Sequence, residues 1–263
     1  LRRHLLRHQA DEHDDNGEVS GLTLRQRSHE RRLPRVGEVE ADDGTSFAAL
    51  MERHRAAHAA DTLDGPAKLR LEGTVNYVNQ GVSGRFELAI DERGEWSQSI
   101  DLGPFGFLRL RADDEGVRCE SAFGPIVSLV GRPAAELMLT IPFVPASAER
   151  ASTAAHPAPL LRQVGPEQAV RHAVVHTADE GARSVTWIDQ ATALAVRLDG
   201  MTWTPIAGLE PIVMTMADYR VVGGMHVPFH VETNQPSLGH AVFVVEHATV
   251  EHADAGAPVG AIP

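Results

Sequence analysis

Residues 69–121 alternate apolar and polar side chains with a period of two, and this alternation constrains the fold more than any other feature. Leu69, Leu71, Val75 and Tyr77 are separated by polar residues, the pattern of a strand with one face in water. Further alternating segments follow, separated by short turns rich in Gly, Asn and Asp. Together they predict strands at 69–77, 82–90, 96–102, 107–111 and 117–121. No crossover helix fits between strands this close together, so the pattern predicts an antiparallel meander and excludes parallel βαβ units.

Helical spacing occurs at two places outside the meander. Phe47, Leu50, Met51 and His54 fall on one stripe, which predicts a helix from residue 47 to about residue 60. A second, short helix is expected after Arg132-Pro133. The fold class is therefore α+β and mainly antiparallel.

The second half of the chain contains another group of predicted strands. Residues 142–166 contain five prolines and little periodicity, which predicts a long loop or flap. Strands are expected at 169–176, 184–189, 193–198, 212–222, 227–233 and 239–250.

The two ends of the sequence differ in composition from the middle. Residues 1–44 are rich in Asp, Glu and Arg, so we expect an extended or disordered lead, with an amphipathic helix over 1–8 as the alternative. The domain is predicted at 45–252, followed by a Gly- and Pro-containing tail or linker at 253–263. The sequence contains no run of eighteen apolar residues, so we do not expect a transmembrane helix. Residues 1–8 lack the apolar core of a secretory signal.

Charge and composition exclude several classes of function. Asp and Glu outnumber Lys and Arg by 36 to 24, giving a formal charge of −12, which argues against nucleic acid and anionic membrane surfaces as partners. Lys68 is the only lysine and Cys119 the only cysteine. Phosphate-loop and Schiff-base chemistry, internal disulfides and zinc sites with several thiolates are therefore not expected.

The candidate catalytic and metal motifs are incomplete. Residues 81–84 lack the spacing of a nucleophile elbow, and 61–65 only superficially resemble an aspartic-protease motif. Three histidine pairs are four apart but have no third ligand nearby, so we interpret them as surface or half-buried residues: His54/His58, His172/His176 and His226/His230. We predict no catalytic residue, no metal and no cofactor.

Three motifs together resemble the outer-membrane lipoprotein-sorting family, the LolA/LolB-like proteins. Residues 217–229 (ADYRVVGGMHVPF) resemble that family's hairpin near the C-terminus. Residues 69–75 with 84–88 resemble its first hairpin, and 188–194 resemble its D-x-x-T-G-L turn, with Ala193 in place of the glycine. The resemblance covers about residues 46–250, with a poor match over 123–166.

The resemblance implies a strongly curved sheet or incomplete barrel, with helices covering a concave face that holds acyl chains. It implies a non-enzymatic carrier in the periplasm or cell envelope, whose partner is a lipid or an acylated protein. The ligand-binding side chains would then be the following: Leu71, Phe86, Leu88, Trp96, Ile100, Phe107, Trp187, Met214, Met216, Phe229 and Val231. An ordinary packed core without a cavity is the alternative for every one of these positions.

Two other functions remain open on the sequence. The Gly- and Pro-containing tail fits an accessory domain of a larger hydrolase, such as an aspartic protease, without catalytic residues in this chain. A structural module that recruits a partner protein through an exposed β edge is the third possibility.

Overall fold

The computed structural model describes residues 46–58, 67–91, 95–113, 115–141, 143, 154–164 and 169–252. The predicted lead over 1–44, its alternative helix at 1–8 and the tail at 253–263 lie outside the described residues. The elements are α1 Phe47–His58, β1 Ala67–Tyr77, β2 Val82–Asp91, β3 Trp96–Asp101, η1 Gly103–Phe105, β4 Phe107–Asp113, β5 Gly116–Ser121, β6 Gly124–Leu129, α2 Arg132–Leu139, β7 Ala154–Val164, β8 Val170–Thr177, η2 Asp179–Gly181, β9 Arg183–Asp189, β10 Ala195–Thr204, β11 Gly208–Val222, β12 Met225–Gln235 and β13 Gly239–His252.

The described strands form one antiparallel sheet in the order β6-β5-β4-β3-β2-β1-β13-β12-β11-β10-β9-β8-β7. Two meanders, β1–β6 and β7–β13, are joined where β1 pairs with β13 along its whole length. This arrangement confirms the predicted α+β, mainly antiparallel class. Among the described residues the end strands β6 and β7 are not neighbours in the sheet, so the sheet is open.

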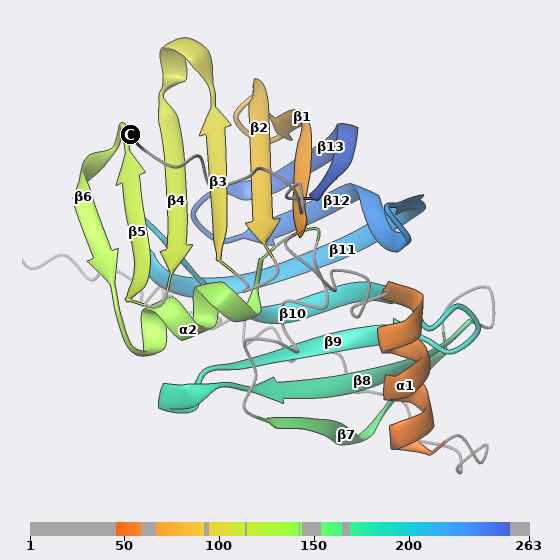
Figure 1. The fold of residues 1–263 in the computed structure, drawn as a ribbon. Coiled ribbons are helices and arrows are strands. Elements are labelled where there is room, and N and C mark those ends of the chain that lie inside the picture. The colour runs from red at the N-terminus through yellow and green to blue at the C-terminus, as the bar shows by residue number, and fades with distance from the viewer. Residues whose placement is uncertain are drawn as a thin grey trace, which may run out of the picture. The chain divides into compact units, whose positions relative to one another are not determined.

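The predicted strong curvature was wrong, because the sheet is neither closed nor strongly curled. The orientation of the strands instead changes across the sheet: in Figure 1, β2–β5 lie vertically in the view, pointing alternately down and up, while β8–β11 lie across it. The ordinary twist between neighbouring strands accumulates over a sheet this wide and produces such a change without closure.

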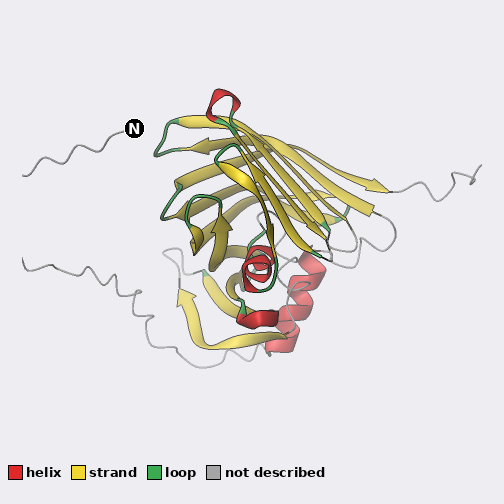
Figure 2. Cartoon of the chain, turned by 90° about the vertical axis from the view of Figure 1, so that its left-hand side faces the viewer, coloured by secondary structure: helices red, strands yellow, loops and turns green. Residues whose placement is uncertain are grey.

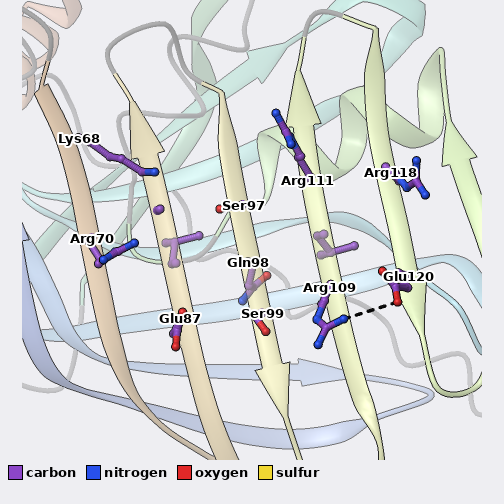
Figure 3. Close-up of a pocket in the computed structure, with 13 residues that line it drawn as sticks. Lys68, Arg70, Glu87, Ser97, Gln98, Ser99, Arg109, Arg111, Arg118 and Glu120 are labelled. Carbon is purple, nitrogen blue, oxygen red and sulfur yellow. Dashed lines mark ion pairs between the residues drawn. The ribbon is translucent and has the colours of Figure 1, made fainter. Parts of the chain in front are cut away.

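The sheet has an apolar face, which we call the inner face, and a polar outer face. Cross-strand pairs place Leu71 opposite Leu88 on the inner face and Arg70 opposite Ala89 on the outer face. Figure 3 shows the outer face of β1–β5 with its charged side chains. The period-two alternation in the sequence is the direct cause of this division.

Helix α1 packs on the inner face of the second meander (Figures 1 and 2). Its Leu50 and Met51 form a small core with Val174 of β8 and Ile188 of β9. Arg53 Nη2 also donates a hydrogen bond of 2.7 Å to the Gln190 carbonyl in the turn after β9.

Helix α2 lies on the same face as α1 and belongs to the main core. Pro133 occupies its first turn, as predicted. Leu137 packs into the core, and the Met138 sulfur accepts a hydrogen bond of 2.9 Å from Trp96 Nε1 of β3.

The sequence interpretation missed two strands. The segment predicted as a loop at 142–166 contains β7, Ala154–Val164, which is paired with β8. Its prolines lie in the end strand of the sheet, which has a neighbouring strand on only one side among the described residues. Proline has no backbone N–H to donate, so it is tolerated in an end strand. Strand β6 is the other end strand, and it also contains a proline, Pro125.

Two small residues in the family-like motifs have clear structural reasons. A Cβ at Gly73 would clash with the Val244 carbonyl of β13, so the first hairpin requires glycine there. Ala193 has φ of 59° although it is not glycine, and its N–H donates to the Asp189 carbonyl. The turn thus keeps the left-handed geometry that a glycine would supply more readily.

Candidate functional site

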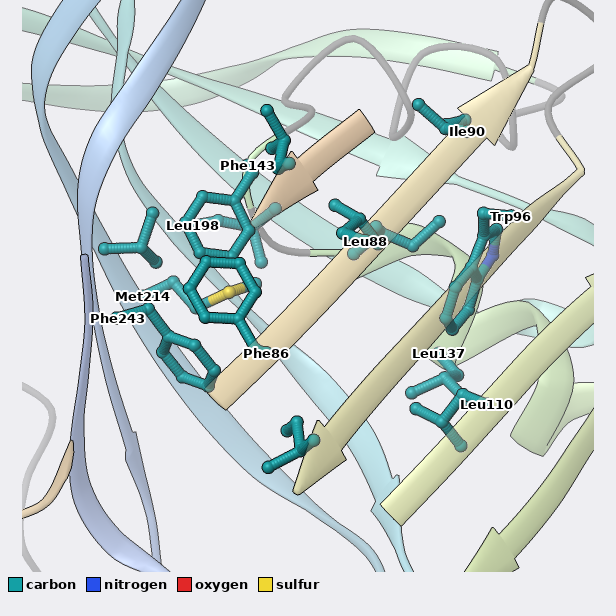
Figure 4. Packing of buried hydrophobic residues seen from close by; sticks show 14 of the residues in the cluster. Phe86, Leu88, Ile90, Trp96, Leu110, Leu137, Phe143, Leu198, Met214 and Phe243 are labelled. Carbon is teal, nitrogen blue, oxygen red and sulfur yellow. The ribbon is translucent and has the colours of Figure 1, made fainter. Parts of the chain in front are cut away.

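Most of the predicted ligand-binding side chains gather in one core on the inner face (Figure 4). This core combines both meanders with helix α2 and Phe143. The predicted residues that belong to it are Leu71, Phe86, Leu88, Trp96, Ile100, Met214, Met216, Phe229 and Val231. Their shared place follows from the register; for example, Phe86 lies opposite Ile100, and Met216 opposite Val231.

Two predicted residues do not share this face. Phe107 lies opposite Asp101 on the outer face, and the Arg109 guanidinium stacks over its ring at 4.7 Å. The neighbouring Leu108 takes the inner position. The strand begins at residue 107, and the short apolar run Phe107-Leu108 does not show which of its two residues faces inward.

Trp187 is also on the outer face. Its register partner on β10 is Arg197, and its Nε1 donates a hydrogen bond of 2.9 Å to Asp199. Thr186 and Ile188 occupy the inner positions instead, since Thr186 lies opposite Leu198 of the core. Strand β9 is buried on both sides near its end, so its sequence does not alternate clearly.

The part of the core around Phe86 is filled by aromatic rings. Phe143 stacks on Phe86 with ring centroids 5.0 Å apart, and Phe243 meets both rings edge to face. Phe143 comes from the segment between α2 and β7, for which the sequence showed no periodicity. Its ring therefore occupies the space on the face of the predicted residue Phe86 where a ligand would have been in contact.

Open space lies instead toward the end of the core formed by the β3–β4 and β12–β13 turns. An inner cavity of about 80 Å³ is bounded by predicted residues Trp96, Ile100 and Met214. A second, larger pocket of about 300 Å³ adjoins it, and the predicted residue Phe107 is part of the lining of this larger pocket although it is not on the inner face. The two share five wall residues, so we treat them as one site: Tyr77, Ile100, Leu108, Pro205 and Leu238.

The rim of the larger pocket is apolar and exposed. Phe105, Phe123 and Ile206 line it with relative exposures of 60%, 53% and 57%. They come from η1 and from two turns, where no periodic pattern marks apolar residues as functional. The sequence signal that could have found them is the occurrence of large apolar residues inside turns, which are usually polar.

Polar groups line the inner end of the cavity. Gln98, the residue that interrupts the apolar alternation of β3, is buried in this wall, with Thr202 and Thr233 nearby. The buried Oε1 of Gln235 has no hydrogen-bond partner among the described residues. A polar group on a bound molecule could therefore be recognised at this end.

The histidine pairs do not form a metal centre in the described part of the chain, where no group of three or more candidate ligands is found. The interpretation of all of them as surface or half-buried was wrong, because His54, His58 and His176 are almost fully buried. His54 Nδ1 is 2.8 Å from the Ala193 carbonyl, and the rings of His54 and His58 are 4.5 Å apart. Burial lowers the pKa of His58 to about 3 and that of His176 to about 4.

Cys119 has no features of a nucleophile. It lies in the main core, and burial raises the pKa of its thiol to about 11. A thiol with such a pKa stays protonated near neutral pH and behaves as a small apolar side chain.

Comparison with known proteins gives matches at the level of structure. No protein-family model matches the sequence, and no curated protein matches it. None of the helices described here is both long and apolar enough to cross a membrane.

Solved structures of three bacterial proteins resemble the chain. A LolA superfamily protein from Nitrosomonas europaea aligns with a TM-score of 0.50 at 8% identity, covering 80% of this chain and 95% of that one. A DUF1329 family protein from Desulfovibrio piger aligns with a TM-score of 0.47 at 11% identity, covering 79% and 94%. A domain described as outer membrane lipoprotein-sorting, from Vibrio parahaemolyticus, gives 0.45 at 10% identity, covering 77% and 93%. The chain therefore has a LolA-like fold, as its three hairpin and turn motifs predicted.

Proposed function

We propose that the chain is a non-enzymatic carrier or binding domain that holds one apolar chain, such as the acyl chain of a lipid or lipoprotein, in the pocket beside the β3–β4 turn. The exposed apolar rim of Phe105, Phe123 and Ile206 carries this proposal. Large apolar side chains that surround the entrance of an apolar pocket are costly in water and are typical of a binding surface. The LolA-like fold supports the same function, and it supports a place in the periplasm or cell envelope.

The energy of such binding follows from the area removed from water. Each buried methylene contributes about 0.8 kcal/mol, so a segment of about ten carbons supplies about 8 kcal/mol, which corresponds to a Kd near 1 μM. A pocket of about 300 Å³ lies at the small end of the usual range for ligand sites. The ligand proposed here is therefore one acyl segment, with its polar group at Gln98 and Gln235 or in water at the rim.

A fluorescent fatty acid, dansylaminoundecanoic acid, tests the proposal. We expect micromolar binding by the wild type. Leu108→Trp places a larger ring in the wall shared by the inner cavity and the outer pocket, and we expect it to weaken binding at least tenfold. Val130→Trp, at an exposed residue outside the pocket, is the matched control and should bind as the wild type does.

A second variant covers the case in which Leu108→Trp disturbs folding. Ile206→Asp changes an exposed residue at the rim and should leave the unfolding midpoint unchanged while weakening probe binding. Wild-type affinity in Ile206→Asp, or no binding by the wild type at any chain length tested, would refute the carrier function.

The edge strand β6 supports a second proposal, namely a partner protein that adds a strand there. Its sequence GPIVSL is uncharged, and Ile126 exposes 53% of its surface. Uncharged edge strands with exposed apolar residues are available for pairing with another chain. Ile126→Lys should abolish capture of such a partner without affecting fatty acid binding, whereas unchanged capture would refute the proposal.

A further inference from the structure

A row of arginines crosses the outer face of the first meander. The register aligns Arg70 with Ala89, Ala89 with Ser97, Ser97 with Arg111, and Arg111 with Arg118. These five residues, which we call the arginine row, run perpendicular to strands β1–β5 (Figure 3). They contain three positive charges and no negative one, in a chain whose formal charge is −12. One of the three, Arg70, is paired with Glu251 of β13 at 3.6 Å.

The positions of Arg111 and Arg118 are electrostatically unfavourable in the protein without a bound partner. They lie directly opposite each other on β4 and β5, and like charges in this position destabilise a sheet. Neither forms an ion pair with any residue in the described ranges. Two residues away on the same two strands, Arg109 of β4 is paired with Glu120 of β5 at 3.6 Å. The sheet therefore neutralises one arginine here and leaves two adjacent ones uncompensated.

The surface at the arginine row is hollowed. The small residues Ala89 and Ser97 lie between Arg70 and Arg111 in the lining of this hollow. Charged side chains of the flanking rows also line it: Lys68, Arg109, Glu87 and Glu120. The groove has a volume of about 510 Å³. A bound group with negative charges could reach Arg111 and Arg118 together, and guanidinium groups pair best with planar, bidentate anions such as carboxylates.

The residues beside the arginine row indicate the shape of the bound molecule. The rows on either side, two residues away along β1–β5, contain six acids against two bases: Glu72, Glu87, Glu120, Asp91, Glu95 and Asp113 against Arg109 and Lys68. Two residues correspond to about 7 Å. A flat anionic bilayer would face these acids as well, whereas an extended peptide, about 5 Å wide in a sheet, can lie on the row alone.

We propose that the arginine row binds an acidic peptide segment of a partner protein, lying across strands β1–β5. Four strand spacings give the row a length of about 19 Å, which matches about six extended residues. The overall charge argued against an anionic partner, but it does not describe this face, where the sheet brings together arginines that are distant in sequence. The site is separate from the inner-face pocket and does not depend on its function.

A fluorescein-labelled hexaglutamate peptide and the full chain test this proposal. We expect binding that weakens as salt is added and that is absent for hexaglutamine. Arg111→Gln and Arg118→Gln should each weaken binding about tenfold, since a charge-assisted contact contributes about 1.4 kcal/mol or more. Both variants should keep the wild-type unfolding midpoint or raise it, because each removes a repulsion.

Arg85→Gln is the matched control, because it removes the same charge from the outer face at a residue paired with Glu246 at 2.8 Å and outside the row. It should bind hexaglutamate nearly as the wild type does. Equal losses in Arg85→Gln and Arg111→Gln would overturn the proposal, as would wild-type binding in the Arg111→Gln/Arg118→Gln double variant. Arginine-dependent binding to phosphatidylglycerol vesicles without binding to hexaglutamate would overturn it in favour of a membrane surface.

Discussion

Two buried histidines of α1, His54 and His58, and one of β8, His176, should make the fold sensitive to mild acid. Burial, the largest effect, lowers the pKa of His54 and brings the pKa values of His58 and His176 to about 3 and 4. In the unfolded chain each imidazole has its ordinary pKa near 6.5. The unfolded state therefore binds more protons than the folded state once the pH falls below about 6.5.

The sign and size of the effect follow from this difference. The stability that the neutral histidines contribute is fully present above about pH 6.5 and decreases as the pH falls toward 4. One pH unit below 6.5, each histidine that stays neutral in the folded state costs about 1.4 kcal/mol. His58 and His176 together lower the free energy of unfolding by about 3 kcal/mol between about pH 7.5 and 5.5, and the lowered pKa of His54 adds a loss of the same sign. This loss is a substantial part of the 5–15 kcal/mol typical of a domain.

Urea unfolding followed by tryptophan fluorescence at these two pH values measures the effect. His176→Leu should reduce the pH-dependent loss by about 1.4 kcal/mol, because it removes a buried imidazole whose Nδ1 has no partner among the described residues. His247→Leu, the same substitution at an exposed residue of β13, is the matched control and should leave the loss unchanged. A loss in His176→Leu equal to that of the wild type would refute the reasoning.

Three substitutions test the local structure, all by urea unfolding. Ala193→Gly should stabilise the fold by about 0.5–1 kcal/mol, because it relieves a left-handed conformation and offsets the entropy that glycine loses; destabilisation would contradict the turn geometry. Tyr219→Phe should cost about 1 kcal/mol, since Tyr219 Oη donates a hydrogen bond of 2.5 Å to the Ala195 carbonyl, and no change would show that bond to be unimportant. Gly73→Ala should cost about 1–3 kcal/mol by forcing β1 away from the Val244 carbonyl, and wild-type stability would count against the close approach.

The sequence predicted those parts of the fold in which one face is buried and the other wet. Leu71 and Phe86 are inward because alternation assigns a whole strand to one face at once. The same rule failed for Trp187, whose strand is buried on both sides near its end, and for Phe107, which begins its strand. Proline concealed β7, because end strands tolerate it and central strands do not.

The candidate pocket was less predictable than the core around it. Ile100 and Trp96 were identified as inner residues, but the sequence could not show that Phe143 fills the space beside Phe86 and moves the opening elsewhere. The rim residues Phe105 and Ile206 lie in turns far apart in the chain. Only the packing of the two meanders brings them together.

A crystal structure of the protein with a brominated fatty acid tests the central claim most directly, since the anomalous signal of bromine locates the chain without ambiguity. The carrier function predicts a bromine peak on the inner face between Ile100, Leu108 and Leu238, with the acyl chain passing the rim at Phe105 and Ile206. A crystal soaked to saturation that shows no bromine there, or shows it only on the outer face, would contradict the claim.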